Sequence, residues 1–241
     1  MASDDRLYYE DAYVRDFSAQ VTDSREKACR LSETAFYPGG GGQPPDHGAF
    51  TVAGRSLAVL RVYTDETGGL WHDVGEDLAV GTQLAGEIEW PRRLALMRRH
   101  TLLHIVNALV LREFQGLITG VHIGEDRCSI DFNIPSISPE QRAGLENSIN
   151  AIITSDLETR SCWIDENEFR NTPSLIRTAD VAPPVIGGRV RVISIGDFDA
   201  QACGGTHVRR TSEIGLCRIT KIDNKGKQNR RFSFSLTPPG K

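Results

Sequence analysis

Several features of membrane and secreted proteins are missing from this sequence. It contains no run of roughly 18 apolar residues, so no transmembrane helix is expected. The stretch from Met1 to Glu10 lacks the basic and then apolar pattern of a signal peptide. Cysteine occurs only 5 times, an odd number at scattered positions, which argues against a disulfide framework. We therefore expect a cytoplasmic protein with reduced thiols and no contact with a membrane.

The remaining composition is ordinary. Apolar residues make up 39% and charged residues 25% of the 241 positions, which is usual for a globular protein of one large or two smaller domains. We find no internal repeat, and no nucleotide cofactor is expected. Four of the cysteines are expected to be small buried residues. They are Cys29, Cys128, Cys162 and Cys217.

The charge is low overall but unevenly distributed. A net charge of -4 argues against indiscriminate binding of nucleic acid over the whole surface. Two basic clusters could nevertheless contact phosphate groups. The first cluster comprises Arg92, Arg93, Arg98 and Arg99. The second comprises Arg209, Arg210, Arg218, Lys221, Lys225, Lys227, Arg230 and Arg231.

The first ninety or so residues have the pattern of a small β-structure. Short apolar alternations at 49–52, 57–62 and 70–74 are separated by turns rich in glycine and aspartate, such as 65–69. This spacing predicts strands of a small barrel or sandwich.

A long helix is predicted to follow. Pro91 is well placed as an early helical residue, apolar positions recur as far as Phe114, and Gly116 marks the end. Two strands at 120–123 and 128–132 then form a predicted hairpin.

The last part of the chain predicts another helix and more strands. Ser138 has the character of a helix N-cap and is followed by proline. Strands are expected at 189–195, 217–222 and 231–236, with a turn at 225–227. The predicted fold class is α+β, with an antiparallel sheet covered on one face by helices.

Two short motifs predict a metal site. His100 and His104 are about one helical turn apart and would project from the same face of the long helix. Cys203 and His207 flank a Gly-Gly pair that lets a loop wrap around an ion. Three imidazoles and a thiolate form a tetrahedral set suited to one zinc ion.

The motifs together resemble those of the AlaX family, which are free-standing relatives of the editing domain of alanyl-tRNA synthetase. The resemblance rests on the glycine-rich stretch 34–48, the two metal motifs and the basic segment 226–231, in this order. Gly39 departs from the family, which often has a polar residue there. The resemblance implies a β-barrel-like domain at 1–90, carrying the glycine-rich motif, and a zinc-dependent editing domain at 91–241.

The resemblance also implies an activity. It implies hydrolysis of the ester of mischarged tRNA(Ala) at the tRNA acceptor end, chiefly of the serine ester, with glycine as the second candidate. Zinc would polarise the ester carbonyl or activate a bound water, and no nucleophile elbow is present. The first motif also lacks the glutamate of the H-E-x-x-H metalloproteases.

Substrate-contacting residues are harder to predict. Selecting serine over alanine requires a polar group that pairs with the extra hydroxyl. The candidates near the motifs are Gln43, Thr101, Thr119 and Thr206. The glycines at positions 40–42 permit close approach of a substrate, so Gly40, Gly41, Gly42 and Gln43 form the predicted substrate loop. Glu125 is better explained as a turn residue. No general base is predicted.

The predicted RNA-binding residues come from the two basic clusters. They are Arg98, Arg99, Arg209, Arg210, Lys225, Lys227, Arg230 and Arg231.

Two alternatives stay open. Four protein ligands fill a tetrahedral shell, which is the pattern of a structural zinc, so the chain could be a zinc-stabilised RNA-binding module without turnover. It could also act on another mischarged tRNA, such as Ser-tRNA(Thr).

Overall fold

The structure is a computed structural model that describes residues 5–178 and 182–237. The chain divides into two compact units. The N-terminal unit consists of Met1–Gly40 and Pro44–Leu94, and the C-terminal unit of Gly41–Gln43 and Ala95–Lys241. Part of the glycine-rich stretch therefore belongs to the C-terminal unit.

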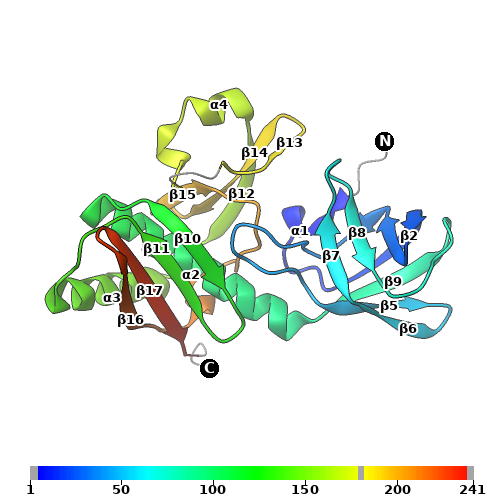
Figure 1. Cartoon of the computed structure of the whole chain (residues 1–241), viewed down its shortest axis with the longest axis horizontal. Helices are drawn as coiled ribbons and strands as arrows, with labels where there is room; N and C mark the ends of the chain where they lie inside the picture. Colours follow the sequence, from blue (N-terminus) through cyan, green and yellow to red (C-terminus); the bar gives the residue numbers. More distant parts are fainter. Residues whose placement is uncertain (1–4, 179–181, 238–241) are drawn as a thin grey trace. The chain divides into compact units, whose positions relative to one another are not determined.

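The N-terminal unit is built mainly from strands (Figure 1). Its elements are β1 (Asp5–Arg6), α1 (Leu7–Glu10), β2 (Asp16–Arg25), β3 (Ala28–Leu31), β4 (Glu33–Thr34), β5 (Gly48–Val52), β6 (Arg55–Val59), β7 (Arg61–Thr64), β8 (Leu70–Asp73) and β9 (Gln83–Ile88). Seven strands form one antiparallel sheet in the order β6-β5-β9-β2-β3-β8-β7, and β1 pairs in parallel with β4. The large sheet is a curled half-barrel whose path ends at β6 and β7, so it is open where the sequence predicted a barrel-like domain.

Aromatic side chains fill the core of this unit. In β2 the side chains alternate, so that Phe17, Ala19 and Val21 are buried between exposed neighbours. The ring of Phe36 packs edge-on against Phe17 and Phe50, with centroid separations of 6.0 and 5.6 Å. Such edge-on pairs add to the stabilisation from burial alone.

The strand predictions for this unit are partly correct. Those at 49–52 and 70–74 are confirmed as β5 and β8. The single strand predicted at 57–62 is wrong, because the chain leaves the strand at Leu60, whose side chain is exposed, and splits it into β6 and β7.

Two members of the first basic cluster, Arg92 and Arg93, are buried inside this unit. The guanidinium of Arg93 forms an ion pair with the carboxylate of Asp46, and both side chains are almost fully buried. Arg93 also donates to the backbone oxygens of Ala12 and Ala35. In this structure Arg93 is a core residue, contrary to its expected place on a basic surface.

The C-terminal unit mixes helices with two antiparallel sheets, which confirms the α+β fold class. Its elements are α2 (Trp90–Phe114, which begins in the N-terminal unit), β10 (Ile118–Ile123), β11 (Cys128–Phe132), α3 (Pro139–Thr154), β12 (Thr159–Asp165), α4 (Glu166–Arg170), η1 (Pro173–Leu175), β13 (Val185–Ile186), β14 (Arg189–Ile195), β15 (Asp199–Ala202), η2 (Thr211–Ile214), β16 (Cys217–Gly226) and β17 (Asn229–Leu236). One sheet has the order β10-β11-β17-β16. In the other, β14 pairs with β12, β13 and β15.

The central helix α2 is confirmed at its predicted bounds and is the main core element. All residues from 101 to 110 are buried, so the helix is covered on every side rather than along one stripe. By length and composition it could span a membrane, yet 72% of the apolar window is buried within the protein. This burial is the behaviour of a core helix.

The later elements also follow the sequence pattern. Ser138 caps α3 by accepting a hydrogen bond from the Gln141 N–H, and the Gln141 side chain accepts one from the Ser138 N–H in return. The predicted turn at 225–227 lies slightly later, at residues 227–228.

The cysteines give one correction. Cys29, Cys128 and Cys217 are buried as predicted, but Cys162 is exposed on β12. All five thiols are free.

Candidate metal centre

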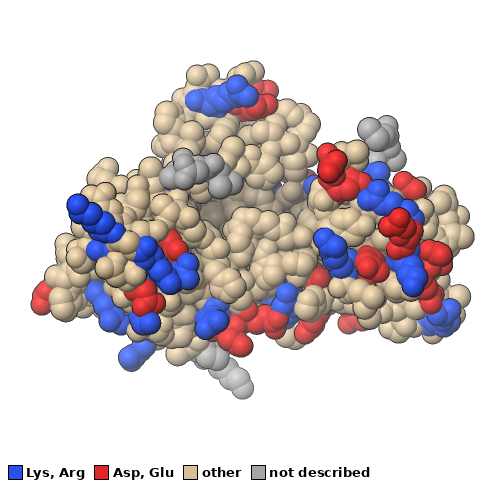
Figure 2. Space-filling view, viewed as in Figure 1, with Lys and Arg blue, Asp and Glu red and all other residues tan. Residues whose placement is uncertain are grey.

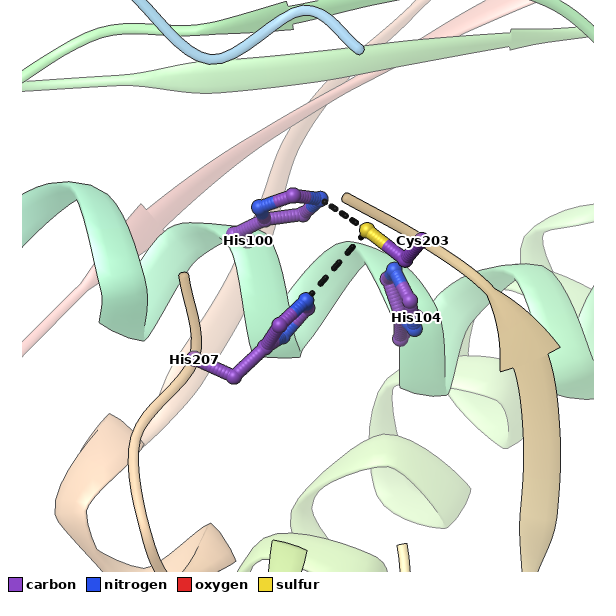
Figure 3. Close-up of side chains that lie close together, drawn as sticks. All are labelled: His100, His104, Cys203 and His207. Atoms are coloured by element: carbon purple, nitrogen blue, oxygen red, sulfur yellow. Dashed lines mark hydrogen bonds between the residues drawn. The ribbon is translucent and has the colours of Figure 1, made fainter. Parts of the chain in front are cut away.

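The two histidines of α2 face the same interior space. His100 and His104 are both buried, and their ring centroids are 5.1 Å apart. The spacing of one helical turn produces this arrangement, as the sequence predicted. In Figure 3 both rings project from α2 toward the side chain of Cys203.

The segment after β15 supplies the other two side chains. Arg191 on β14 fixes this segment, because its Nη1 donates to the backbone oxygens of Cys203 (3.3 Å) and Gly205 (2.8 Å), and its own carbonyl accepts from the Cys203 N–H. Arg191 is buried, and the sequence analysis did not identify it. The sequence offered one indication of its role, because Arg191 lies between the apolar residues Val190 and Val192 of the predicted strand.

The four side chains converge on one point. The Nε2 atoms of His100 and His207 each lie 3.4 Å from the Sγ atom of Cys203. One ligand atom from each residue lies within 4.8 Å of all the others. A tetrahedral zinc ion would separate its nitrogen and sulfur ligands by about 3.5 Å. We call this set the His/Cys cluster; it consists of His100, His104, Cys203 and His207.

Neighbouring groups fix the orientation of two imidazoles. His100 Nδ1 donates to Gln43 Oε1 at 2.9 Å, because a carbonyl oxygen can only accept. The Thr101 hydroxyl donates to the Met97 carbonyl and accepts from His207 Nδ1 at 3.1 Å. Both histidines therefore carry the proton on Nδ1 and direct the lone pair of Nε2 toward Cys203.

The remaining histidine provides an independent indication of a ligand. His104 Nδ1 is buried without a hydrogen-bond partner among the described residues. A buried nitrogen without a partner is costly. Burial also sets the protonation of the cluster: it lowers the pKa of His100 to about 3 and places those of His104 and His207 well below the ordinary value. Neutral imidazoles are the form that binds a metal. The cluster therefore fits zinc.

The same burial raises the pKa of the Cys203 thiol. Binding of a metal would therefore have to displace the thiol proton.

The glycine-rich loop reaches the cluster through Gln43. Besides accepting from His100, the Gln43 side chain donates to Thr206 Oγ1 at 2.8 Å and accepts from the Thr206 N–H. The carbonyl of Gly42 accepts from the Ile123 N–H, and a Cβ on Gly42 would lie 2.6 Å from a methyl carbon of Val121. Gly41 and Gly42 also have positive φ angles.

The other predicted contact residues are divided between two environments. Thr101 and Thr206 are buried beside the cluster, whereas Thr119 is exposed on β10 and donates to Asn229. Gly40 belongs to the N-terminal unit and accepts from the Tyr37 hydroxyl. Glu125 lies exposed in the loop after β10.

The predicted RNA-binding residues also differ in exposure. Arg99 and Arg230 are buried, and Arg98 donates to the carbonyls of Ile214 and Thr237. Arg231 forms an ion pair with Asp131. The exposed members are Arg209, Arg210, Lys225 and Lys227.

Comparisons with known proteins find related sequences. Residues 190–233 match the family model described as "Threonyl and Alanyl tRNA synthetase second additional domain". The chain is 36% identical to the alanyl-tRNA editing protein AlaX-M of Saccharolobus solfataricus, over 97% of this chain and 99% of that protein. It is 33% identical to the AlaX-M protein of Methanosarcina mazei, over 95% of each. The alanine–tRNA ligase of Haloquadratum walsbyi is 34% identical over 89% of this chain, but only 24% of that larger protein is covered.

Proposed function

Because this chain belongs to the AlaX family of alanyl-tRNA editing proteins, we propose that it is a deacylase that hydrolyses the aminoacyl ester of mischarged tRNA(Ala). The observation that carries the proposal is the His/Cys cluster, with three buried histidines and a half-buried cysteine, in a chain that matches AlaX-M relatives over nearly its whole length. Serine is the proposed amino acid, with glycine as the second candidate. We propose a cytoplasmic location, where charged tRNA is found.

The His/Cys cluster is proposed to hold one zinc ion. When bound, zinc supplies a Lewis acid beside the scissile ester. Gln43 and Thr101 hold the imidazoles of His100 and His207 in the tautomer that leaves Nε2 free to bind the ion. Arg191 fixes the backbone that carries Cys203.

Recognition of serine is proposed to involve Thr206. Its hydroxyl oxygen accepts from Gln43 Nε2, but the hydroxyl hydrogen has no acceptor among the described residues. Thr101 and Thr119, in contrast, already donate to Met97 and Asn229. A donor that pairs with the substrate hydroxyl would be left unpaired by alanine, which disfavours alanine.

We assign two further roles in the same proposal. The proposed substrate loop consists of Gly40, Gly41, Gly42 and Gln43, of which Gly40 belongs to the N-terminal unit. The exposed cations Arg209, Arg210, Lys225 and Lys227 would contact the tRNA near its acceptor end.

The test is a side-by-side deacylation assay. Purified protein should release serine from Ser-tRNA(Ala) faster than alanine from Ala-tRNA(Ala), with Gly-tRNA(Ala) and Ser-tRNA(Thr) in the same panel. Background hydrolysis of every substrate would contradict the proposal. Faster hydrolysis of Ser-tRNA(Thr) than of Ser-tRNA(Ala) would identify tRNA(Thr) in place of tRNA(Ala) as the preferred tRNA.

One observation favours a second candidate function. The cluster has four protein ligands, which is the pattern of a structural zinc, so the chain could be an RNA-binding module without turnover. Chelation separates the two readings, because it should unfold the C-terminal unit if zinc is structural and mainly abolish deacylation if zinc is catalytic.

A further inference from the structure

A groove of about 700 Å³ lies in the C-terminal unit between the start of α3 and strand β16. Its lining includes Ser138, Arg142, Glu146, Arg218, Asn224 and Arg230. This volume is within the usual range of ligand-binding sites in proteins. Several lining residues, Arg218 and Asn224 among them, are exposed, so the groove is accessible from solvent.

Polar side chains of α3 form one side of the groove. Strand β16 is the last strand of its sheet, so no strand pairs with its outer edge. Arg142 donates to the Ile219 carbonyl, and the Glu146 carboxylate accepts from the Ile219 N–H at 2.7 Å. Asn150 bonds to both backbone groups of Cys217. These bonds fix the helix against the strand edge, and the groove continues past them to Asn224.

The arginines of the groove lack acidic partners. Arg142, Arg218 and Arg230 form no ion pair among the described residues. The acidic side chain in the lining, Glu146, already accepts a backbone hydrogen bond. The neighbouring Arg231, in contrast, forms an ion pair with Asp131 at 2.7 Å. The lining therefore carries three arginines against one carboxylate, which leaves it positively charged.

Arg230 is the most informative of the three. Only 8% of its surface is exposed, yet its hydrogen bonds all involve Nη1 and reach the neutral groups of Asn224, Gly226 and Asn229. Its Nε and Nη2 atoms have no hydrogen-bond partner within the described part of the chain. These donors remain open to a ligand in the groove, which Arg230 lines. The planar fork of donors suits a phosphate group.

We propose that this groove binds the phosphodiester backbone of the tRNA substrate. The inference rests on the proposed function, which requires a long polyanion to dock on the C-terminal unit. Figure 2 supports docking at this side, because blue side chains predominate over red ones where β16 and β17 lie. Arg218 and Arg142 would contact the backbone from the two sides of the groove, and Arg230 from its floor.

The experiment measures binding of uncharged tRNA as a function of salt concentration. Arg218→Ala is the main variant, because Arg218 is exposed and makes no hydrogen bond that folding requires. Arg170→Ala is the control: Arg170 is 71% exposed on α4, where it pairs with Glu166, and it does not line the groove. Loss of one phosphate contact should lower the salt slope by about 1 and weaken binding about tenfold at 0.1 M salt. The control should keep the wild-type slope and affinity.

Three outcomes would overturn the proposal. The first is a wild-type slope and affinity for Arg218→Ala. The second is an equal loss in Arg170→Ala, which would indicate a general charge effect. The third is weakened binding of inorganic phosphate to Arg218→Ala without any change for tRNA, which would make the groove a small-anion site.

Uncharged tRNA keeps this test separate from the proposed function. If the wild-type protein binds tRNA through Arg218 but releases no serine, the deacylase proposal fails and the groove proposal stands. If it releases serine and Arg218→Ala binds tRNA normally, only the groove proposal fails.

Discussion

The side chain of Gln43 accepts a hydrogen bond from Nδ1 of His100 at 2.9 Å, although 57 residues separate the two in sequence. This bond connects the glycine-rich loop to the His/Cys cluster and determines which nitrogen of His100 faces Cys203. Gln43 thus acts on the metal site through another residue.

Gln43→Ala should lower zinc affinity by about 10- to 100-fold, because the partner that orients His100 is lost. Gln43→Glu keeps an acceptor for Nδ1 and should retain more of the affinity. Competition with a chelating dye measures both. Gln228→Ala removes an exposed glutamine of the same unit and should leave zinc affinity unchanged. Equal zinc affinity in wild type and Gln43→Ala would contradict the assigned role.

Gly205→Ala should disrupt the cluster through steric contact alone. A Cβ at this position would lie 2.2 Å from Cε1 of His100, closer than real contacts allow, so the ring must move. We expect loss of most bound zinc, measured as metal content of the purified protein.

The comparison for this prediction is Gly144→Ala. Gly144 lies in α3 with no atom within 4 Å of the added carbon, so the substitution should retain zinc and stabilise the helix by up to about 1 kcal/mol. Full zinc content in Gly205→Ala would mean that the loop can move away without loss of the site.

His72 should make the N-terminal unit sensitive to acid. It is fully buried, Nδ1 donates to the Cys29 carbonyl, and Nε2 accepts from the Thr34 hydroxyl at 2.9 Å. Burial lowers its pKa to about 4. At pH values between about 6.5, the ordinary pKa of histidine, and about 4, the unfolded chain binds a proton at His72 that the folded chain does not bind. The contribution of neutral His72 to the free energy of unfolding is therefore fully present above about pH 6.5. About 3 kcal/mol of it is lost as the pH falls to about 4.

Hydrogen exchange of amides in β8 measures this effect, because it reports the opening free energy of the unit that contains His72. His72→Gln should remove most of the loss between pH 7 and pH 4.5. His122→Gln, which removes an exposed histidine from β10, should behave like wild type. An unchanged pH dependence in His72→Gln would show that other groups cause the loss.

The sequence predicted local features better than long-range ones. Helical spacing placed His100 and His104 on one face of α2, and Ser138 with Gln141 marked the start of α3, because both depend on neighbours within one turn. Strands β2 and β9 were not predicted, since small residues such as Ala19 and Gly86 occupy inward positions and weaken the alternation.

The surroundings of the cluster depend on tertiary contacts. Nothing local indicated that Gln43 would reach Thr206, 163 residues away, or that Arg93 would be buried against Asp46. The first basic cluster was interpreted as a surface for the same reason: the sequence shows the charge of Arg92 and Arg99 but not their burial.

The most direct test of the account compares Cys203→Ala with Cys162→Ala. Cys203 belongs to the His/Cys cluster, whereas Cys162 is an exposed thiol on β12. Zinc content, affinity for uncharged tRNA and single-turnover release of serine from Ser-tRNA(Ala) should be measured on one preparation of each protein. We predict that Cys203→Ala loses zinc and slows serine release by more than about a hundredfold while still binding tRNA, and that Cys162→Ala matches wild type. Full zinc and undiminished serine release in Cys203→Ala would contradict the account.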